Sequence, residues 1–197
     1  MKFFVETKGA SINGAAGMVG NLLAEGNLKL SNLERPGQAV PKGGKYTNYQ
    51  GGNGIAQWTG IRRTRFEQAV IGDLRYTVDN REEYEDAIRA KGLEAQLEYA
   101  WNELKSNYKS SYKAIKSTTI DSSQASTDIV SDFEKPGSYL NWRYEKRRIN
   151  KGISVGKAKA EWLITKNKRA KLAADAKATY EASLATYEAS LTPGKSS

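Results

Sequence analysis

The sequence predicts a predominantly helical α+β fold, in which short helices surround one small β-hairpin and a long helix follows at the C-terminal end. Three observations predict it. Apolar residues recur at three- and four-residue spacing through most of the chain. Turn-forming glycines and prolines are concentrated between residues 26 and 60, around short β-capable pieces such as residues 45–49. Residues 157–191 contain neither glycine nor proline.

The first expected helix covers residues 11–25 and is mostly buried. Ser11 or Asn13 is expected to cap its N-terminal end, because their side chains accept hydrogen bonds from the free amides of a first turn. Gly17 and Gly20 lower the helix propensity of this segment. We therefore expect the helix to pack closely against another backbone.

Six further segments show helical spacing after the glycine-rich region. They cover residues 62–70, 81–90, 93–104, 110–116, 122–133 and 140–150. We expect these helices and the hairpin to belong to one domain, residues 1–152.

Residues 153–197 are expected to form a separate helical segment, about 50 Å long over residues 157–191 if the helix is continuous. The heptad 178–184 repeats letter for letter as residues 185–191. Tyrosine and leucine alternate by four and three in this repeat, which predicts a coiled-coil seam. Its members are Tyr180, Leu184, Tyr187 and Leu191. Docking to a partner protein and self-association are equal alternatives for such a seam.

The absence of cysteine and histidine limits the chemistry of the chain. It excludes a thiol nucleophile, a Ser-His-Asp triad and a zinc site built on imidazole or thiolate. Enzymatic proton transfer would therefore depend on Asp, Glu, Lys or Tyr. We expect no cofactor and no metal.

The chain carries 31 basic and 22 acidic residues, a net charge of +9. Such a charge attracts nucleic acid, anionic lipid or anionic cell-wall polymers, and it also keeps a protein soluble. A basic cluster near residue 147 indicates a solvated helix face, or a surface that holds anionic polymers; it comprises Arg143, Lys146, Arg147, Arg148 and Lys151. No apolar stretch is long enough to span a membrane. Glu6 and Lys8 interrupt the opening apolar run, so we expect no export signal.

Glu25 is the first candidate for acid catalysis. It lies at the end of an apolar helix and before a glycine-rich loop. Partial removal from water and the negative end of the helix dipole both favour the protonated form of a carboxyl group there. A protonated carboxyl can donate its proton to a glycosidic oxygen. A solvated glutamate at a helix end is the alternative.

Residues 51–60 form the second candidate feature, with the sequence GGNGIAQWTG. Its glycines let a backbone approach a ligand closely. Asn53 and Gln57 offer donors and acceptors, and Trp58 offers a flat face on which a sugar can stack. The alternative is a turn that enters a helix, with Trp58 in the core.

Four separated motifs together resemble the phage tail lysozyme family, which is similar in fold to goose-type lysozymes and lytic transglycosylases. They are AAGMVGNLLAE at residues 15–25, GIAQWTGIRR at 54–63, LEAQLEYAWNEL at 93–104, and ASTDIV with FEKPG within 125–137. The resemblance covers about residues 11–150 in the family's order and ends near residue 149.

The resemblance implies a lysozyme-like helical domain that hydrolyses the β-1,4 bond between N-acetylmuramic acid and N-acetylglucosamine in peptidoglycan. It implies that Glu25 is the general acid and that Gln57, in a Gly-x-x-Gln motif, contacts the substrate. Relatives usually have serine directly after the glutamate, whereas this chain has Gly26.

A second carboxylate is harder to assign. Retaining glycosidases place one about 5–5.5 Å from the acid, and inverting enzymes place it farther away. Only Glu34 is acidic between residues 26 and 60, and Asp73 follows the next helix. We therefore expect inversion, with Glu34 or Asp73 as the base, or with a water positioned by Gln57 or by the substrate. Tyr46 and Tyr49 are candidates to join Asn53 and Trp58 in contacting the sugar, and core packing or surface exposure is the alternative for them.

A lysozyme of a phage particle is the function expected from these observations. Its partners would be peptidoglycan glycan strands and, through residues 153–197, tail or other virion proteins or sister copies. Its location would be the virion, from which it acts on the host cell wall. A lytic transglycosylase giving a 1,6-anhydro product, or a non-catalytic structural tail protein, is the alternative. No nucleic-acid reading motif occurs in the chain.

Overall fold

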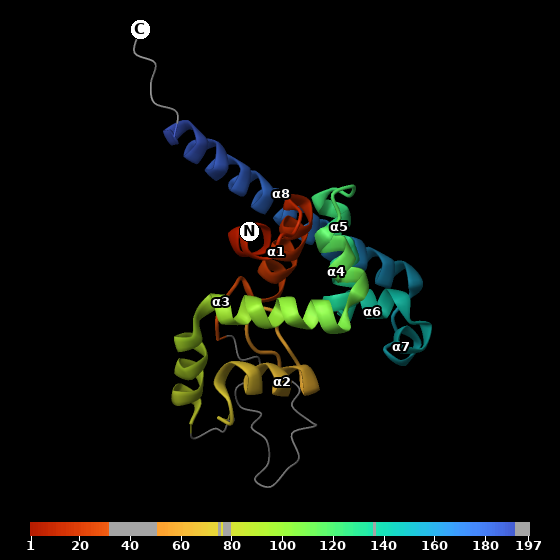
Figure 1. The fold of residues 1–197 in the computed structure, drawn as a ribbon. Helices are drawn as coiled ribbons and strands as arrows, with labels where there is room; N and C mark the ends of the chain where they lie inside the picture. The colour runs from red at the N-terminus through yellow and green to blue at the C-terminus, as the bar shows by residue number, and fades with distance from the viewer. Residues whose placement is uncertain (32–50, 75, 77–79, 136, 192–197) are drawn as a thin grey trace. The chain divides into compact units, whose positions relative to one another are not determined.

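The computed structural model of the chain describes residues 1–31, 51–74, 76, 80–135 and 137–191, and most of these residues are helical (Figure 1). In these residues, two short π-helices, η1 and η3, accompany eight α-helices. In order these are η1 (Phe3–Thr7), α1 (Ile12–Gly26), α2 (Gly60–Ile71), α3 (Arg81–Asn107), α4 (Lys109–Lys116), α5 (Ser122–Ile129), η3 (Val130–Glu134), α6 (Gly137–Arg143), α7 (Glu145–Asn150) and α8 (Val155–Leu191).

The helical part of the prediction is confirmed, but the β-hairpin is not. The described residues contain no strand, and their only β-pairing is an isolated antiparallel bridge between Asn53 and Trp58. The β-capable piece at residues 45–49 lies outside the described residues. The segment 140–150, expected as one helix, is divided between α6 and α7 at Tyr144.

The described chain divides into two compact units. Unit 1 comprises Met1–Asn21 with Ser110–Ser197, and unit 2 comprises Leu22–Lys109. Helix α1 contributes its first ten residues to unit 1 and its last turn to unit 2. Neither unit ends at residue 152, so the expected division of the chain there stays a prediction.

Within unit 1, α1 packs backbone to backbone against its neighbours, as its glycines predict. Ser11 caps the helix, since its Oγ accepts a 2.9 Å hydrogen bond from the amide of Gly14. A Cβ on Gly17 would lie 2.7 Å from the amide nitrogen of Ser126 in α5. A Cβ on Gly20 would lie 2.6 Å from the amide nitrogen of Ala173 in α8. Both distances are shorter than real contacts of a Cβ atom, so both positions require glycine.

Substitution of Gly14 by alanine is expected to destabilise the protein by at least about 1–3 kcal/mol, because the added methyl group overpacks a rigid contact. Its Cβ would meet the carbonyl oxygen of Ile115 at 2.1 Å, and backbone has little room to move. Gly156→Ala in α8 is the matched control, since a Cβ there meets nothing within 4 Å. Thermal unfolding should show a large fall in Tm for the first variant alone, and equal Tm values would contradict the packing.

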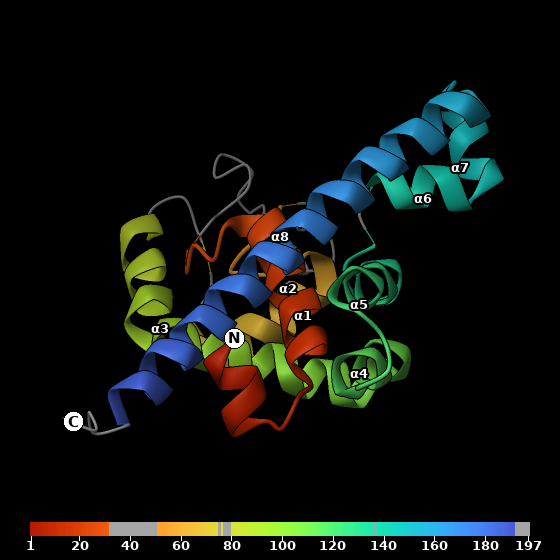
Figure 2. The ribbon, with the colours of Figure 1, turned by 90° about the horizontal axis from the view of Figure 1, so that it is seen from above.

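Helix α8 packs along α5 and α6 in unit 1 (Figure 2). One stripe of its residues is buried, namely Ala158, Trp162, Arg169, Ala173 and Tyr180. The two copies of the repeated heptad differ in burial. Tyr180 is buried and donates a 3.3 Å hydrogen bond to Glu6, whereas Tyr187 is 62% exposed. The coiled-coil seam therefore stays a prediction.

In unit 2, α2 packs along α3 (Figure 1). Gly92 interrupts α3 with a left-handed φ of 75°, so the two helices expected at residues 81–90 and 93–104 are confirmed as two parts of α3. After this break, α3 buries Gln96 and Glu103. Gln96 hydrogen-bonds the turn before α2, and Glu103 hydrogen-bonds both that turn and Arg62 of α2.

Candidate active site

Glu25 lies in the last turn of α1 and is partly buried. The helix ends at Gly26, because Asn27 and Leu28 adopt left-handed backbone conformations with φ of 50° and 56°. The expected end of this helix is therefore confirmed, and Glu25 belongs to unit 2.

A tight turn in the same unit joins Asn53 to Trp58. The two residues exchange backbone hydrogen bonds of 3.1 and 2.9 Å, and the amide of Gln57 donates to the carbonyl of Gly54 over 3.1 Å. Gly54 has a φ of 71°, and a Cβ there would lie 2.7 Å from Oε1 of Gln96. Both the backbone conformation and the lack of space require glycine at this position.

The end of α1 packs directly on this turn. A Cβ on Gly26 would lie 3.4 Å from the carbonyl oxygens of Gly54 and Ile55, and 3.7 Å from Nε2 of Gln57. The residue that follows Glu25 is thus in van der Waals reach of the turn that carries Gln57. A serine Cβ at position 26 would make ordinary contacts, so the departure from the family pattern leaves the packing of this helix end unchanged.

Gln57 differs from its neighbours in the turn because it is partly exposed, whereas residues 51–56 and Trp58 are buried. Its backbone is left-handed, with a φ of 46°. Its Nε2 donates a 3.1 Å hydrogen bond to the carbonyl of Gly54, which holds the amide group beside the turn. The structure therefore brings Gln57 and the helix end of Glu25 together at one place in unit 2.

Trp58 is fully buried and stacks on Phe66 with ring centroids 4.2 Å apart. Tyr99 meets it edge to face at 5.3 Å. Because the indole is fully buried, no face of it is open for a sugar to stack on in this structure. Asn53 is also fully buried, so its side chain serves the turn rather than an open surface.

Glu103 anchors the turn from α3. One of its carboxylate oxygens accepts a 2.8 Å hydrogen bond from Nε1 of Trp58. Arg62 of α2 donates to both oxygens, through Nε at 2.7 Å and Nη2 at 2.8 Å. Such a two-point pairing fixes geometry as well as charge. Glu103 thereby joins α2, α3 and the turn.

A second buried network of side chains holds the start of the turn, at Gly51 and Asn53. The side chains of Arg63 and Tyr84 both donate to Glu67, and all three are buried. Arg63 also donates to the carbonyl of Gly51 at 3.2 Å. Asn53 donates to the Tyr84 hydroxyl at 2.9 Å through its Nδ2. Three side chains of α2 and α3 thus determine where the turn begins.

The protonation of this network follows from its burial. Burial, and then the Glu67 carboxylate, raise the pKa of Tyr84 far above its usual range, so its hydroxyl remains a donor. Burial alone would lower the pKa of Arg63, but the Glu67 carboxylate and the Tyr84 hydroxyl outweigh it and raise the pKa. Arg63 therefore stays charged.

These anchoring residues were missed in the sequence, although a signal for part of them exists. Gln96 and Glu103 are seven residues apart and lie on the buried stripe of α3. A polar side chain on an apolar stripe usually has a buried partner. Gln96 accepts from the amide of Ile55 at 3.1 Å and donates to the carbonyl of Leu30 at 2.7 Å.

Tyr99 predicts a loss of stability at alkaline pH. Burial, followed by the charge of Glu103, raises the pKa of its hydroxyl to about 12. An unfolded tyrosine titrates near ~10. As the pH rises, the unfolded chain therefore loses this proton before the folded protein does. The free energy of unfolding that Tyr99 contributes is complete below pH ~10. It falls as the pH rises toward 12, by about 1.4 kcal/mol per pH unit.

Denaturant unfolding of the parent and of Tyr99→Phe, measured at a series of pH values, checks this prediction. The parent is expected to lose stability more steeply than the variant in that interval. Parallel curves for the two proteins would contradict it.

Of the remaining predicted site residues, the structure describes Asp73 alone. Glu34, Tyr46 and Tyr49 lie outside the described residues. Asp73 is exposed in the segment after α2. Within the described ranges, no group of three or more His, Cys, Asp or Glu side chains is placed to hold a metal ion.

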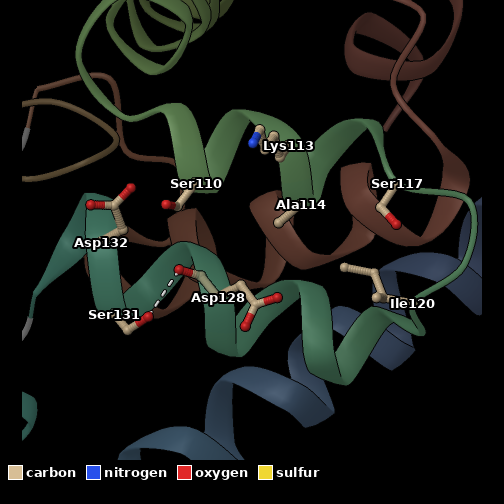
Figure 3. A pocket seen from close by; sticks show the side chains of 8 residues that line it. All are labelled: Ser110, Lys113, Ala114, Ser117, Ile120, Asp128, Ser131 and Asp132. Carbon is tan, nitrogen blue, oxygen red and sulfur yellow. Dashed lines mark hydrogen bonds between the residues drawn. The ribbon is translucent and has the colours of Figure 1, made fainter.

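A separate polar groove of about 510 Å³ lies in unit 1, between α4 and the α5–η3 segment (Figure 3). Asp128 and Asp132 line one side of it, and Lys113 lines the other. Asp132 is already bound by the amide and the hydroxyl of Ser111, at 3.3 and 3.2 Å. None of the residues predicted for catalysis or substrate contact lines this groove.

Comparison with known proteins gives one match. No curated protein and no solved structure matches the chain. A family model described as phage tail lysozyme matches residues 1–187, which is nearly the whole chain and includes Glu25, the Gln57 turn and most of α8. The chain therefore belongs to the phage tail lysozyme family, whose members are phage-associated proteins of the lysozyme type.

Proposed function

We propose that the protein is a muramidase, which hydrolyses the β-1,4 bond between N-acetylmuramic acid and N-acetylglucosamine, and that Glu25 is its general acid. The observation that supports this most is the packing of Gly26 on the Gly54–Gln57 turn. It brings the end of α1, with the partly buried Glu25, to a turn whose one partly exposed side chain is Gln57. A carboxyl group that can donate a proton and an amide group that can hold the sugar or a water are two groups that glycosidic cleavage uses.

In the proposed reaction, Glu25 donates its proton to the glycosidic oxygen as the bond to that oxygen breaks. The amide of Gln57 binds either the acetamido group of the sugar or the attacking water. Water then adds to the anomeric carbon on the face opposite to the leaving group. The proton that this water loses passes to Glu34, to Asp73 or to solvent.

The anchoring networks support the same proposal. A turn that is to hold a substrate must not move when the substrate binds, because misplacement of a contacting group lowers the rate. Here Glu103, Gln96 and the Arg63–Glu67–Tyr84 network hold the turn at Trp58, Ile55 and Gly51. We infer that this rigidity serves to position Gln57.

Digestion of purified peptidoglycan, followed by mass spectrometry of the released muropeptides, tests the proposal. A hydrolase yields products with a reducing end, whereas a transglycosylase yields 1,6-anhydro products that are lighter by one water. Proton NMR during the reaction reports the anomer formed first. We expect reducing ends and the α-anomer; anhydro products would support the transglycosylase alternative, and no product would support a structural role.

The setting proposed for this activity is the phage particle, from which the enzyme opens the host cell wall during infection. The second heptad of α8 supports it, since Tyr187 is 62% exposed, although it lines the same pocket as Glu6 of η1. We propose that this end of α8 docks on another virion protein.

A further inference from the structure

The positive charge of the protein is concentrated in one segment. Residues 143–171 contain eleven lysines or arginines and two glutamates, a net charge of +9, which equals that of the whole chain. The rest of the chain therefore carries no net charge. The segment runs from the end of α6 through α7 into the first half of α8, and all of it belongs to unit 1.

Large apolar side chains are exposed in the same part of unit 1. Helix α6 packs against α8, and α7 packs against α6 (Figure 2). The exposed apolar residues of these helices are Trp142, Tyr144, Ile149, Val155, Leu163 and Ile164. Trp142 is held in place, because it stacks on the buried Trp162 with ring centroids 6.0 Å apart. Beyond this stacking, the apolar residues remain available for a partner.

The connection between α7 and α8 forms a tight corner, which we define as residues 149–157. Backbone hydrogen bonds of 3.0 Å join Gly152 to Ile149 and Ile153 to Arg148, so the corner has a fixed shape. Ile149 and Val155 at its two ends are 66% and 62% exposed. Lys151 and Lys157 of the same corner are exposed as well.

The combination of these side chains discriminates between partners. Lysine and arginine attract any polyanion, but an exposed isoleucine or valine gains nothing from the phosphates of nucleic acid or of a wall polymer. Both kinds of side chain gain at a lipid bilayer, where the cations meet anionic head groups and the aliphatic groups enter the acyl boundary. A second copy of this segment would be repelled by its equal charge.

We propose that the α7–α8 corner binds the surface of an anionic lipid bilayer. Ile149 and Val155 insert at the acyl boundary, and the surrounding lysines and arginines contact the head groups. The binding is peripheral, since no helix in the described part of the chain is long and apolar enough to cross a membrane. This activity is independent of the proposed cleavage of the wall.

Vesicle flotation tests the proposal, with vesicles of phosphatidylcholine alone and of phosphatidylcholine mixed with phosphatidylglycerol. We expect the full chain to bind the anionic vesicles at least about tenfold more tightly, since each lysine near such a surface adds about 1 kcal/mol. Added salt should weaken the binding, because it screens exposed charges.

Two pairs of substitutions separate the contribution of the lysines to vesicle binding from that of the aliphatic side chains. Lys157→Glu with Lys159→Glu, and Ile149→Ser with Val155→Ser, are each expected to weaken binding to anionic vesicles at least about tenfold. The matched controls change lysines and aliphatic residues of unit 2 that are also exposed, namely Lys91, Lys105, Ile61 and Leu93. Lys91→Glu with Lys105→Glu, and Ile61→Ser with Leu93→Ser, are expected to change the binding less than about twofold. Circular dichroism and Tm verify that all variants are folded.

Three results would overturn the proposal. The first is equal or absent binding to both kinds of vesicle. The second is binding to a soluble polyphosphate that only the lysine variants weaken, which would identify a soluble polyanion as the partner. The third is a dimer of the parent, seen by light scattering, that Ile149→Ser with Val155→Ser abolishes, which would identify a second copy.

Discussion

Replacement of Glu25 by glutamine is expected to lower the rate of wall clearing by about 10²–10⁴-fold, because general acid catalysis contributes a factor of this size. Glutamine keeps the shape of the side chain and its place in the last turn of α1, but its amide cannot supply the proton. The loss should appear in kcat, since binding of the glycan strands through Gln57 is unchanged. Turbidity of a wall suspension and zymography measure it.

The matched control for this variant is Glu98→Gln, a partly buried glutamate on α3 that lies outside the proposed site. Its activity should equal that of the parent. Both variants should unfold at the parent's Tm, which would show that the loss is chemical. If Glu25→Gln clears walls as fast as the parent does, Glu25 is not the acid and another carboxyl group must be sought.

The second large effect concerns stability. Arg63→Met is expected to destabilise the protein by about 3–5 kcal/mol, because it leaves the Glu67 carboxylate buried without its cation. The same change removes the hydrogen bond that Arg63 donates to the carbonyl of Gly51. Denaturant unfolding measures the free energy, and activity should fall further than stability alone explains, since the turn loses one anchor.

Two further variants test whether the unpaired Glu67 carboxylate causes this loss of stability. Arg89→Met removes an exposed ion pair with Glu85 and should cost less than about 1 kcal/mol. Arg63→Met combined with Glu67→Met removes both charges and should recover part of the lost stability. A double variant that is less stable than Arg63→Met would show that packing, and not charge, accounts for the effect.

Local sequence signals predicted the helices of this protein well. Ser11 begins α1 and Gly26–Asn27 ends it, because capping and left-handed turns depend on the residues at the ends themselves. Gly17 and Gly20 predicted close approach of a backbone, but not which one, since the partners lie more than a hundred residues away in α5 and α8. The spacing of residues in the sequence shows which face of a helix is buried, but only the folded structure shows which element packs against that face.

The candidate site was predicted less completely. Glu25 and Gln57 came from motifs, and the packing of Gly26 on the turn supports their proximity. For Trp58 the sequence left two environments open, because an indole next to a turn suits both a sugar-binding surface and a core. The buried partner of its Nε1, Glu103, decides between the two, and it lies 45 residues further along the chain.

The duplicated heptad near the end of α8 has a consequence for how this helix can vary. Because residues 178–184 and 185–191 are identical, deletion of either copy produces the same polypeptide. The tyrosine that contacts Glu6 is kept in both cases, so gain or loss of a unit changes only how far the helix continues beyond that contact. Gain or loss of one seven-residue unit would thus lengthen or shorten this end of α8 by two helical turns, or about 10 Å.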